Sequence, residues 1–149
     1  MYREILFKAK REDNGEWVEG WYHRATFKEE LKSYIKHNAT DNAEKIFMYD
    51  IDYEVNSDTL CQYTGLMDKN GKKIWENDIV LLREEIQDYE WKAEVKFGNP
   101  NSEYNWGWQL VSIGECDMNK DILLWIDMEI ANCEVIGNIF DNIDLLEVE

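Results

Sequence analysis

The stretch WKAEVKFG, from Trp91 to Gly98, carries the clearest structural pattern in the chain. Its apolar side chains occupy alternate positions, and charged side chains occupy the positions between them. A period of two places the apolar side chains on one face of a strand, whereas a helix requires a period near 3.6. We therefore predict a strand with one buried face, ended by a turn at GNPN, residues 98–101.

Strand patterns continue on both sides of this stretch. Asn-Gly dipeptides at 14–15 and 70–71 predict two tight hairpins, because both residue types tolerate positive φ. A turn at Asn56-Ser57-Asp58 is expected between strands 46–51 and 59–64. Further strands are predicted over 78–82, 104–110 and 134–140, with a short terminal turn or helix at 144–148. Residues 121–131 fit both a strand and a helix, and their alternation favours the strand.

One segment, near residues 27–37, is predicted to be a helix. Phe27, Leu31, Tyr34 and Ile35 recur at helical spacing, and Thr26 with Glu29 three positions later resembles a capping box. The sequence therefore indicates a β-rich α+β class with antiparallel strands and one short helix.

The charge balance excludes several function classes. The chain holds 16 Lys and Arg against 32 Asp and Glu, a net charge of −16, and residues 81–149 hold 4 of the basic and 16 of the acidic side chains. Direct nucleic-acid binding and polybasic docking to a membrane both need a surplus of Lys and Arg. Hydrophobic residues make up 44% of the chain, which excludes a disordered acidic tail.

The length of 149 residues suits a single domain, 1–149, with a possible N-terminal lobe 1–56 and a C-terminal β-barrel lobe 57–149. We expect no membrane span and no signal peptide, because apolar runs are short. Cys61, Cys116 and Cys133 are widely spaced and are expected to be buried thiols of a cytoplasmic protein.

No pattern in the chain indicates catalysis. The only histidines are His23 and His37, and no nucleophile elbow, metalloprotease helix, phosphate loop or dinucleotide motif occurs. We therefore expect no enzyme and no cofactor. The pair Asp50 and Asp52 and the acidic stretch 117–129 have the chemistry of a divalent-cation site, although solvated surface is the simpler interpretation.

Two aromatic stripes stand out on predicted strands. One contains Trp17 and Trp21, and the other contains Tyr104, Trp106 and Trp108. Aromatic residues on one strand face most often build a core, less often a subunit interface or a platform on which bases or sugars stack.

Three segments resemble the YopX family of phage and prophage proteins. REILFKA, residues 3–9, is similar to the family's opening, and QYTGLMDKNGKKIWENDIV, residues 62–80, is similar to its central signature. EVIGNIFDNIDLLE, residues 134–147, resembles its ending. The chain departs from the family pattern where Asn77 replaces Gly, which predicts a positive-φ turn, and where Ile143 replaces Pro.

The resemblance implies a fold-making role for the motif residues and no established activity. Strand entries like that at 78–80 also occur in small SH3-like barrels, so a small SH3-like barrel or sandwich is expected around residues 60–140. The structural motif residues are Gly65, Asn70, Gly71, Asp78, Gly137 and Asn138. They are expected to shape turns, cap a strand entry and allow close packing.

Three functions follow from these observations. The leading hypothesis is a non-enzymatic protein-interaction module in the cytoplasm of a bacterial host, whose acidic C-terminal half meets a host or phage protein. The alternatives are an acidic nucleic-acid mimic that blocks a host DNA-binding protein, and a carboxylate-based metal-dependent enzyme. A homo-oligomer is also possible, because exposed strand edges invite pairing.

Overall fold

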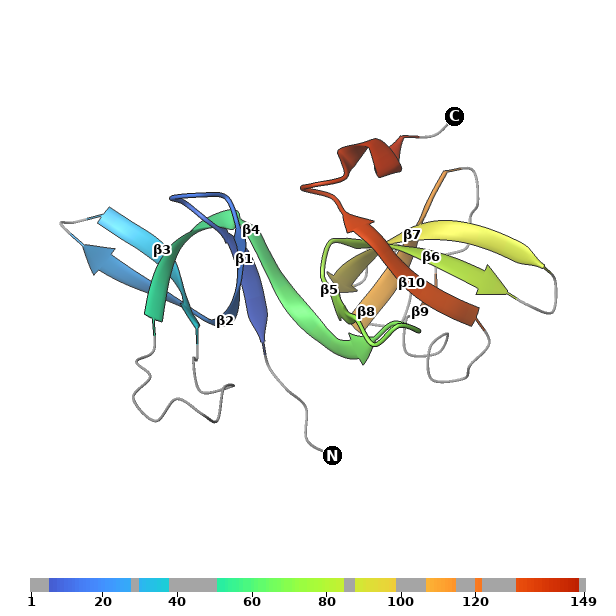
Figure 1. The fold of residues 1–149 in the computed structure, drawn as a ribbon, viewed down its shortest axis with the longest axis horizontal. Coiled ribbons are helices and arrows are strands. Elements are labelled where there is room, and N and C mark those ends of the chain that lie inside the picture. Colours follow the sequence, from blue (N-terminus) through green and yellow to red (C-terminus); the bar gives the residue numbers. More distant parts are fainter. Residues whose placement is uncertain are drawn as a thin grey trace. The chain divides into compact units, whose positions relative to one another are not determined.

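A computed structural model describes residues 6–27, 30–37, 51–84, 88–98, 107–114, 120–121 and 131–147 (Figure 1). The chain divides into two compact units, residues 1–63 and residues 64–149. Each unit is built from antiparallel strands and is described separately below.

The first unit is built on four long antiparallel strands. Strand β1 pairs with β2, β2 with β3, β3 with β4, and β4 also pairs back with β1. The pairings therefore form a closed circuit, which Figure 1 shows as a curled sheet. The strands are β1 (Phe7–Arg11), β2 (Trp17–Phe27), β3 (Glu30–His37) and β4 (Ile51–Met67), the last of which continues into the second unit.

The core of the first unit consists of alternate residues from all four strands. Ala9, Val18, Ile35 and Val55 are buried, and aromatic side chains including Tyr22 pack against them. The predicted hairpin at Asn14-Gly15 is confirmed: it joins β1 to β2, with Gly15 at a φ of 72°. Burying one face of each strand accounts for the period-two pattern of this half.

The predicted turn at 56–58 is a bulge inside one continuous strand. The register between β1 and β4 shifts here, since Lys8 lies opposite Cys61 and Lys10 opposite Asn56. The Thr59 hydroxyl accepts the Lys10 N–H at 2.8 Å and donates to the Asn56 carbonyl at 2.7 Å. The side chain thus takes the place of the ladder bonds that the extra residues interrupt.

The helix predicted near residues 27–37 is wrong, because Phe27 ends strand β2 and Glu30–His37 forms strand β3. Ile35 lies in the core opposite Tyr22, whereas Tyr34 lies on the other face and stacks on His23 with ring centroids 5.4 Å apart. Adjacent residues pointing to opposite faces are the signature of a strand. Among the described residues, the helical geometry is the single 3-10 turn η2 (Ile143–Leu146).

The second unit contains a five-stranded antiparallel sheet in the order β10-β6-β7-β8-β9, and β5 pairs with β4. Its core combines Ile74 of β5 with Val80, Leu82, Trp91, Val95, Trp108, Leu110 and Cys133 of the sheet. The strands are β5 (Lys73–Trp75), β6 (Asp78–Glu84), β7 (Tyr89–Gly98), β8 (Gly107–Ile113), β9 (Lys120–Asp121) and β10 (Ala131–Asn138).

The β-rich, antiparallel class is confirmed, but the SH3-like barrel is not. Within the described part of residues 64–147, the pairings run from β10 to β9 without a bond that joins these two end strands. The sequence pattern of residues 121–131 fits both a strand and a helix, and residues 122–130 of this stretch lie outside the described residues. Tyr104 and Trp106 also lie outside them. In the described part, no helix is long and apolar enough to cross a membrane.

Candidate functional site

The central motif folds around the carboxylate of Asp68, which lies in the turn between β4 and β5. Its Oδ1 accepts the backbone N–H groups of Asn70 at 2.8 Å and Lys72 at 2.9 Å, and its Oδ2 accepts that of Val135 at 2.9 Å. The residue is only 8% exposed. Asp68 therefore fixes a local turn with one oxygen and holds a strand 67 residues away with the other.

The surroundings of Asp68 favour its charged form. Burial opposes ionisation, but the hydrogen bonds from Val135, Lys72 and Asn70, together with the charge of Lys72, outweigh it and lower the pKa of the carboxyl. The neighbouring Cys133 shows the opposite effect. Burial raises the pKa of its thiol to about 12, with a further contribution from the nearby carboxylates. A thiol held protonated in this way is a poor nucleophile.

The same turn covers the outer edge of β10. The Lys69 N–H donates to the Cys133 carbonyl at 3.0 Å, and the Val135 N–H donates to Asp68. Since β10 pairs with β6 on its other side, these bonds satisfy backbone groups that an edge strand normally leaves open.

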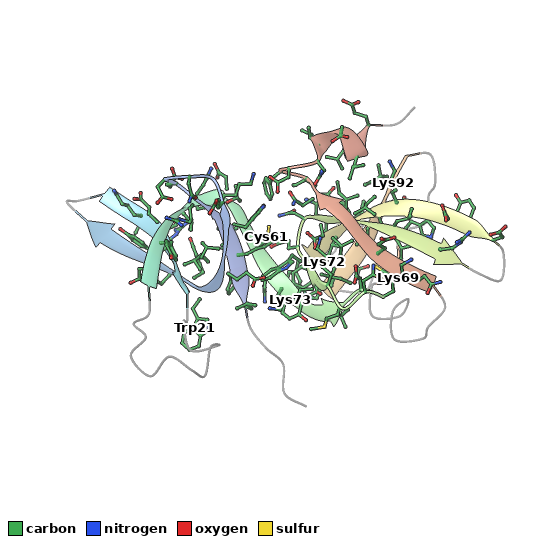
Figure 2. The ribbon with its side chains drawn as sticks, viewed as in Figure 1. Trp21, Cys61, Lys69, Lys72, Lys73 and Lys92 are labelled. Atoms are coloured by element: carbon green, nitrogen blue, oxygen red, sulfur yellow. The ribbon has the colours of Figure 1, made fainter. Side chains whose placement is uncertain are left out.

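Gly65, Asn70 and Gly71 lie in or next to this turn. Gly65 and Gly71 have φ values of 85° and 79°, which a residue with a Cβ adopts only with strain. The Gly71 N–H donates to the Asp68 carbonyl, and the Asp68 N–H donates to the Lys72 carbonyl. Figure 2 labels Lys69, Lys72 and Lys73 on this segment.

Asp78 caps the sharp turn between β5 and β6. Its Oδ2 accepts the Trp75 N–H at 2.8 Å, and the residue is almost completely buried. Asn77 has a φ of 70°, which confirms the positive-φ turn predicted there. Its N–H donates to the Val95 carbonyl, and its side-chain oxygen accepts a bond from the Lys96 ammonium at 3.1 Å. This turn is thereby tied to β7.

Gly137 and Asn138 shape the end of β10. A Cβ added at Gly137 would lie 2.5 Å from the Asn142 side-chain oxygen, so glycine is required for this close approach. Asn138 accepts the N–H groups of Phe140 and Asp141 on its side chain, both at 2.9 Å. The structure thus places all six motif residues at turns or strand ends, in three separate groups.

The two carboxylates in these groups, those of Asp68 and Asp78, are buried. The described hydrogen bonds direct the carboxylates of Asp68 and Asp78 at backbone donors. Across the ranges that the structure describes, no three His, Cys, Asp or Glu side chains lie close enough together to hold a metal ion. Asp52 bonds His23 at 3.0 Å, and its predicted partner Asp50 lies outside those ranges.

The aromatic stripes separate into core and surface. Trp108 is 4% exposed and belongs to the core of the second unit, as predicted. Trp21 is 64% exposed and does not belong to a core, and Figure 2 shows its side chain standing away from the strands of the first unit. The ammonium groups of Lys8 and Lys10 lie 4.6 Å and 5.4 Å from the centre of the Trp17 ring.

Residues 141–147, the terminal segment, expose acidic and apolar side chains. Ile143 begins η2 and is 68% exposed, and Asp141, Asp144 and Glu147 around it are also exposed. This segment is joined to the sheet by the Lys92 ammonium, which donates to the Leu145 carbonyl at 3.2 Å.

Sequence reasoning missed a polar cluster in the first unit, formed by Tyr22, Arg24 and Ser33. The Tyr22 hydroxyl accepts the Arg24 Nε–H at 3.0 Å and lies 3.1 Å from the Ser33 hydroxyl. Burial opposes ionisation of Tyr22, but the bonds to Ser33 and Arg24 outweigh it and lower the pKa of the phenol. Alternation along β2 places Tyr22 and Arg24 on one face, but only the register of β3 brings Ser33 beside them.

Taken together, two small antiparallel β units whose motif residues shape the backbone define a β-rich protein. The family model described as YopX protein matches residues 6–147, and the chain belongs to this family.

Among solved structures, the crystal structure of protein EF1440 from Enterococcus faecalis is similar at 21% identity, with a TM-score of 0.45. The match covers 98% of this chain and 100% of that one. No curated protein matches.

Proposed function

We propose that this YopX protein is a non-enzymatic interaction module of the host cytoplasm, whose acidic C-terminal half binds a basic surface of a host or phage protein. The observation that carries the proposal is the terminal segment, where exposed Ile143 stands among the exposed carboxylates of Asp141, Asp144 and Glu147. An apolar anchor surrounded by a polar, solvent-accessible rim is a common arrangement in protein–protein contacts.

The other described charges of this half support the choice. The Arg83 guanidinium lies 3.8 Å from the Asp88 carboxylate and 3.5 Å from that of Glu90. The Lys96 ammonium lies 2.6 Å from the Glu94 carboxylate. These acids have basic neighbours within the chain, and Asp141 of the terminal segment accepts a hydrogen bond from the Asn138 side-chain amide at 3.1 Å. The terminal carboxylates combine negative charge with an exposed apolar side chain, so a basic partner gains both electrostatic attraction and apolar burial there.

The test compares capture of host proteins by the unmodified protein and by the triple variant D141N/D144N/E147Q. The matched control is E12Q/E16Q/D58N, which neutralises three exposed acids of the first unit. We expect a partner that is retained by the control, lost by the terminal variant and weakened by added salt. Equal capture by all three proteins would refute the proposed surface.

A further inference from the structure

We propose that the cluster of Tyr22, Arg24 and Ser33 is a binding site for a small organic carboxylate. The site belongs to the first unit and is independent of the acidic segment discussed above. All three side chains extend from the face of β2 and β3 that also carries Ile35 of the core.

The hydrogen bonds within the cluster leave donors for a ligand. A guanidinium carries five N–H groups, and Arg24 uses the Nε–H for Tyr22. Within the described ranges, the four remaining N–H groups on the two terminal nitrogens are not used in a hydrogen bond, and Arg24 is exposed. Two terminal nitrogens of one guanidinium match the two oxygens of a carboxylate.

The two hydroxyls add a further donor. Tyr22 and Ser33 share one hydrogen bond, so only one of their two hydroxyl protons lies between them, whichever residue donates. The second proton is directed to an acceptor outside the pair. Because Arg24 donates to the phenol oxygen, it also makes the Tyr22 hydroxyl a stronger donor.

An apolar side chain on the same face defines the rest of the ligand. Leu31 lies two positions before Ser33 on β3 and is 59% exposed. In the strand register, its partner Thr26 follows Arg24 by two positions, which places Leu31 diagonally across from Arg24. A carboxylate with an attached ring or alkyl group would reach the guanidinium with its oxygens and cover Leu31 with its carbon atoms.

The first test titrates the full-length protein with benzoate and follows its backbone amide resonances. Acetate tests the apolar part of the ligand, benzamide tests the charge, and inorganic phosphate tests the geometry of the anion. We expect saturable shifts at residues 22–24 and 31–35 with benzoate, at least fivefold weaker binding of acetate and phosphate, and no binding of benzamide. Equal binding of benzamide and benzoate would overturn the proposal, and so would tighter binding of phosphate.

Variants then assign the role of each group. R24Q is expected to weaken benzoate binding at least tenfold, and L31A is expected to reduce benzoate to the affinity of acetate. R83Q, which removes an exposed arginine of the second unit, is the control and should bind as the unmodified protein does. If R24Q fails to fold, R24K keeps the charge without the planar pair of nitrogens and should still lose most of the affinity. If R24Q, or R24K where R24Q does not fold, binds benzoate as tightly as the unmodified protein does, the proposed site is refuted.

Discussion

Replacing Asp68 by Asn tests whether one carboxylate holds the motif together. An amide retains one acceptor oxygen and replaces the other with an NH2 group, so in either orientation a donor faces a backbone N–H. If the NH2 faces Val135, a buried donor loses its partner at a cost of about 1–3 kcal/mol. The hydrogen bonds from Asn70 and Lys72 would then have a neutral acceptor in place of a charged one. This change lowers the contribution of each bond to stability by roughly 1 kcal/mol.

D68N is therefore expected to lower the free energy of unfolding by about 3–5 kcal/mol at pH 7. Urea unfolding followed by tryptophan fluorescence measures this change, since Trp91 and Trp108 lie in the core of the same unit. D144N, which alters an exposed carboxylate of that unit, should change stability by less than about 0.5 kcal/mol. A loss in D68N no larger than that of D144N would refute the reasoning.

The dependence on pH gives an independent measurement of the same group. The pKa of Asp68 is lower in the folded protein than in the unfolded chain. Its ionised form therefore stabilises the fold fully above the unfolded value, near 3.9, and this stabilisation is lost as pH falls through the folded pKa. We expect the D68N variant to lose less stability than the unmodified protein between about pH 4 and pH 2. If the free energy of unfolding falls equally with pH in D68N and in the unmodified protein, the lowered pKa does not belong to Asp68.

Three further outcomes are expected. G137A should lower the free energy of unfolding in urea by about 1–3 kcal/mol, because the added Cβ meets the Asn142 side chain. In the double variant G137A/N142A part of this stability should return, and fully additive effects of the two changes would count against the contact. Both N77G and N77V lose the bond to Lys96, and N77V should destabilise by at least about 1 kcal/mol more than N77G in thermal unfolding, since valine at a φ of 70° is strained. Cys133 should stay unlabelled by a thiol reagent at pH 8 in the folded protein and react on unfolding, as mass spectrometry of the peptides would show; rapid labelling of the native state would contradict the raised pKa.

Strand positions were predictable where alternation was unambiguous, as in β7, and where Asn-Gly marked a turn. Strand β3 was not, because residues four apart share a face in a strand as well as in a helix. Leu31 and Ile35 satisfy both patterns, but Phe27 is the last residue of β2, and the pairing of β2 with β3 decides for the strand.

The candidate sites were less predictable than the strands. Local pattern indicates turn residues such as Gly71 and Asp78, but it cannot show that Asp68 reaches Val135. The Tyr22, Arg24 and Ser33 cluster depends in the same way on strand register. Trp21 looked like a core residue because alternation identifies a shared face without revealing which face is buried.

The covered edge of β10 restricts how a partner can recognise the second unit. Proteins that bind by β-augmentation add a strand whose backbone bonds to an open sheet edge. At β10 the Cys133 carbonyl and the Val135 N–H are already bonded, so an incoming strand would first have to displace the Asp68 carboxylate. Recognition along this edge is therefore left to side chains. The bond to Asp68 consequently also disfavours pairing of β10 with a strand of a second copy of the chain. Such edge-to-edge pairing is a route to aggregation for sheets with an uncovered edge.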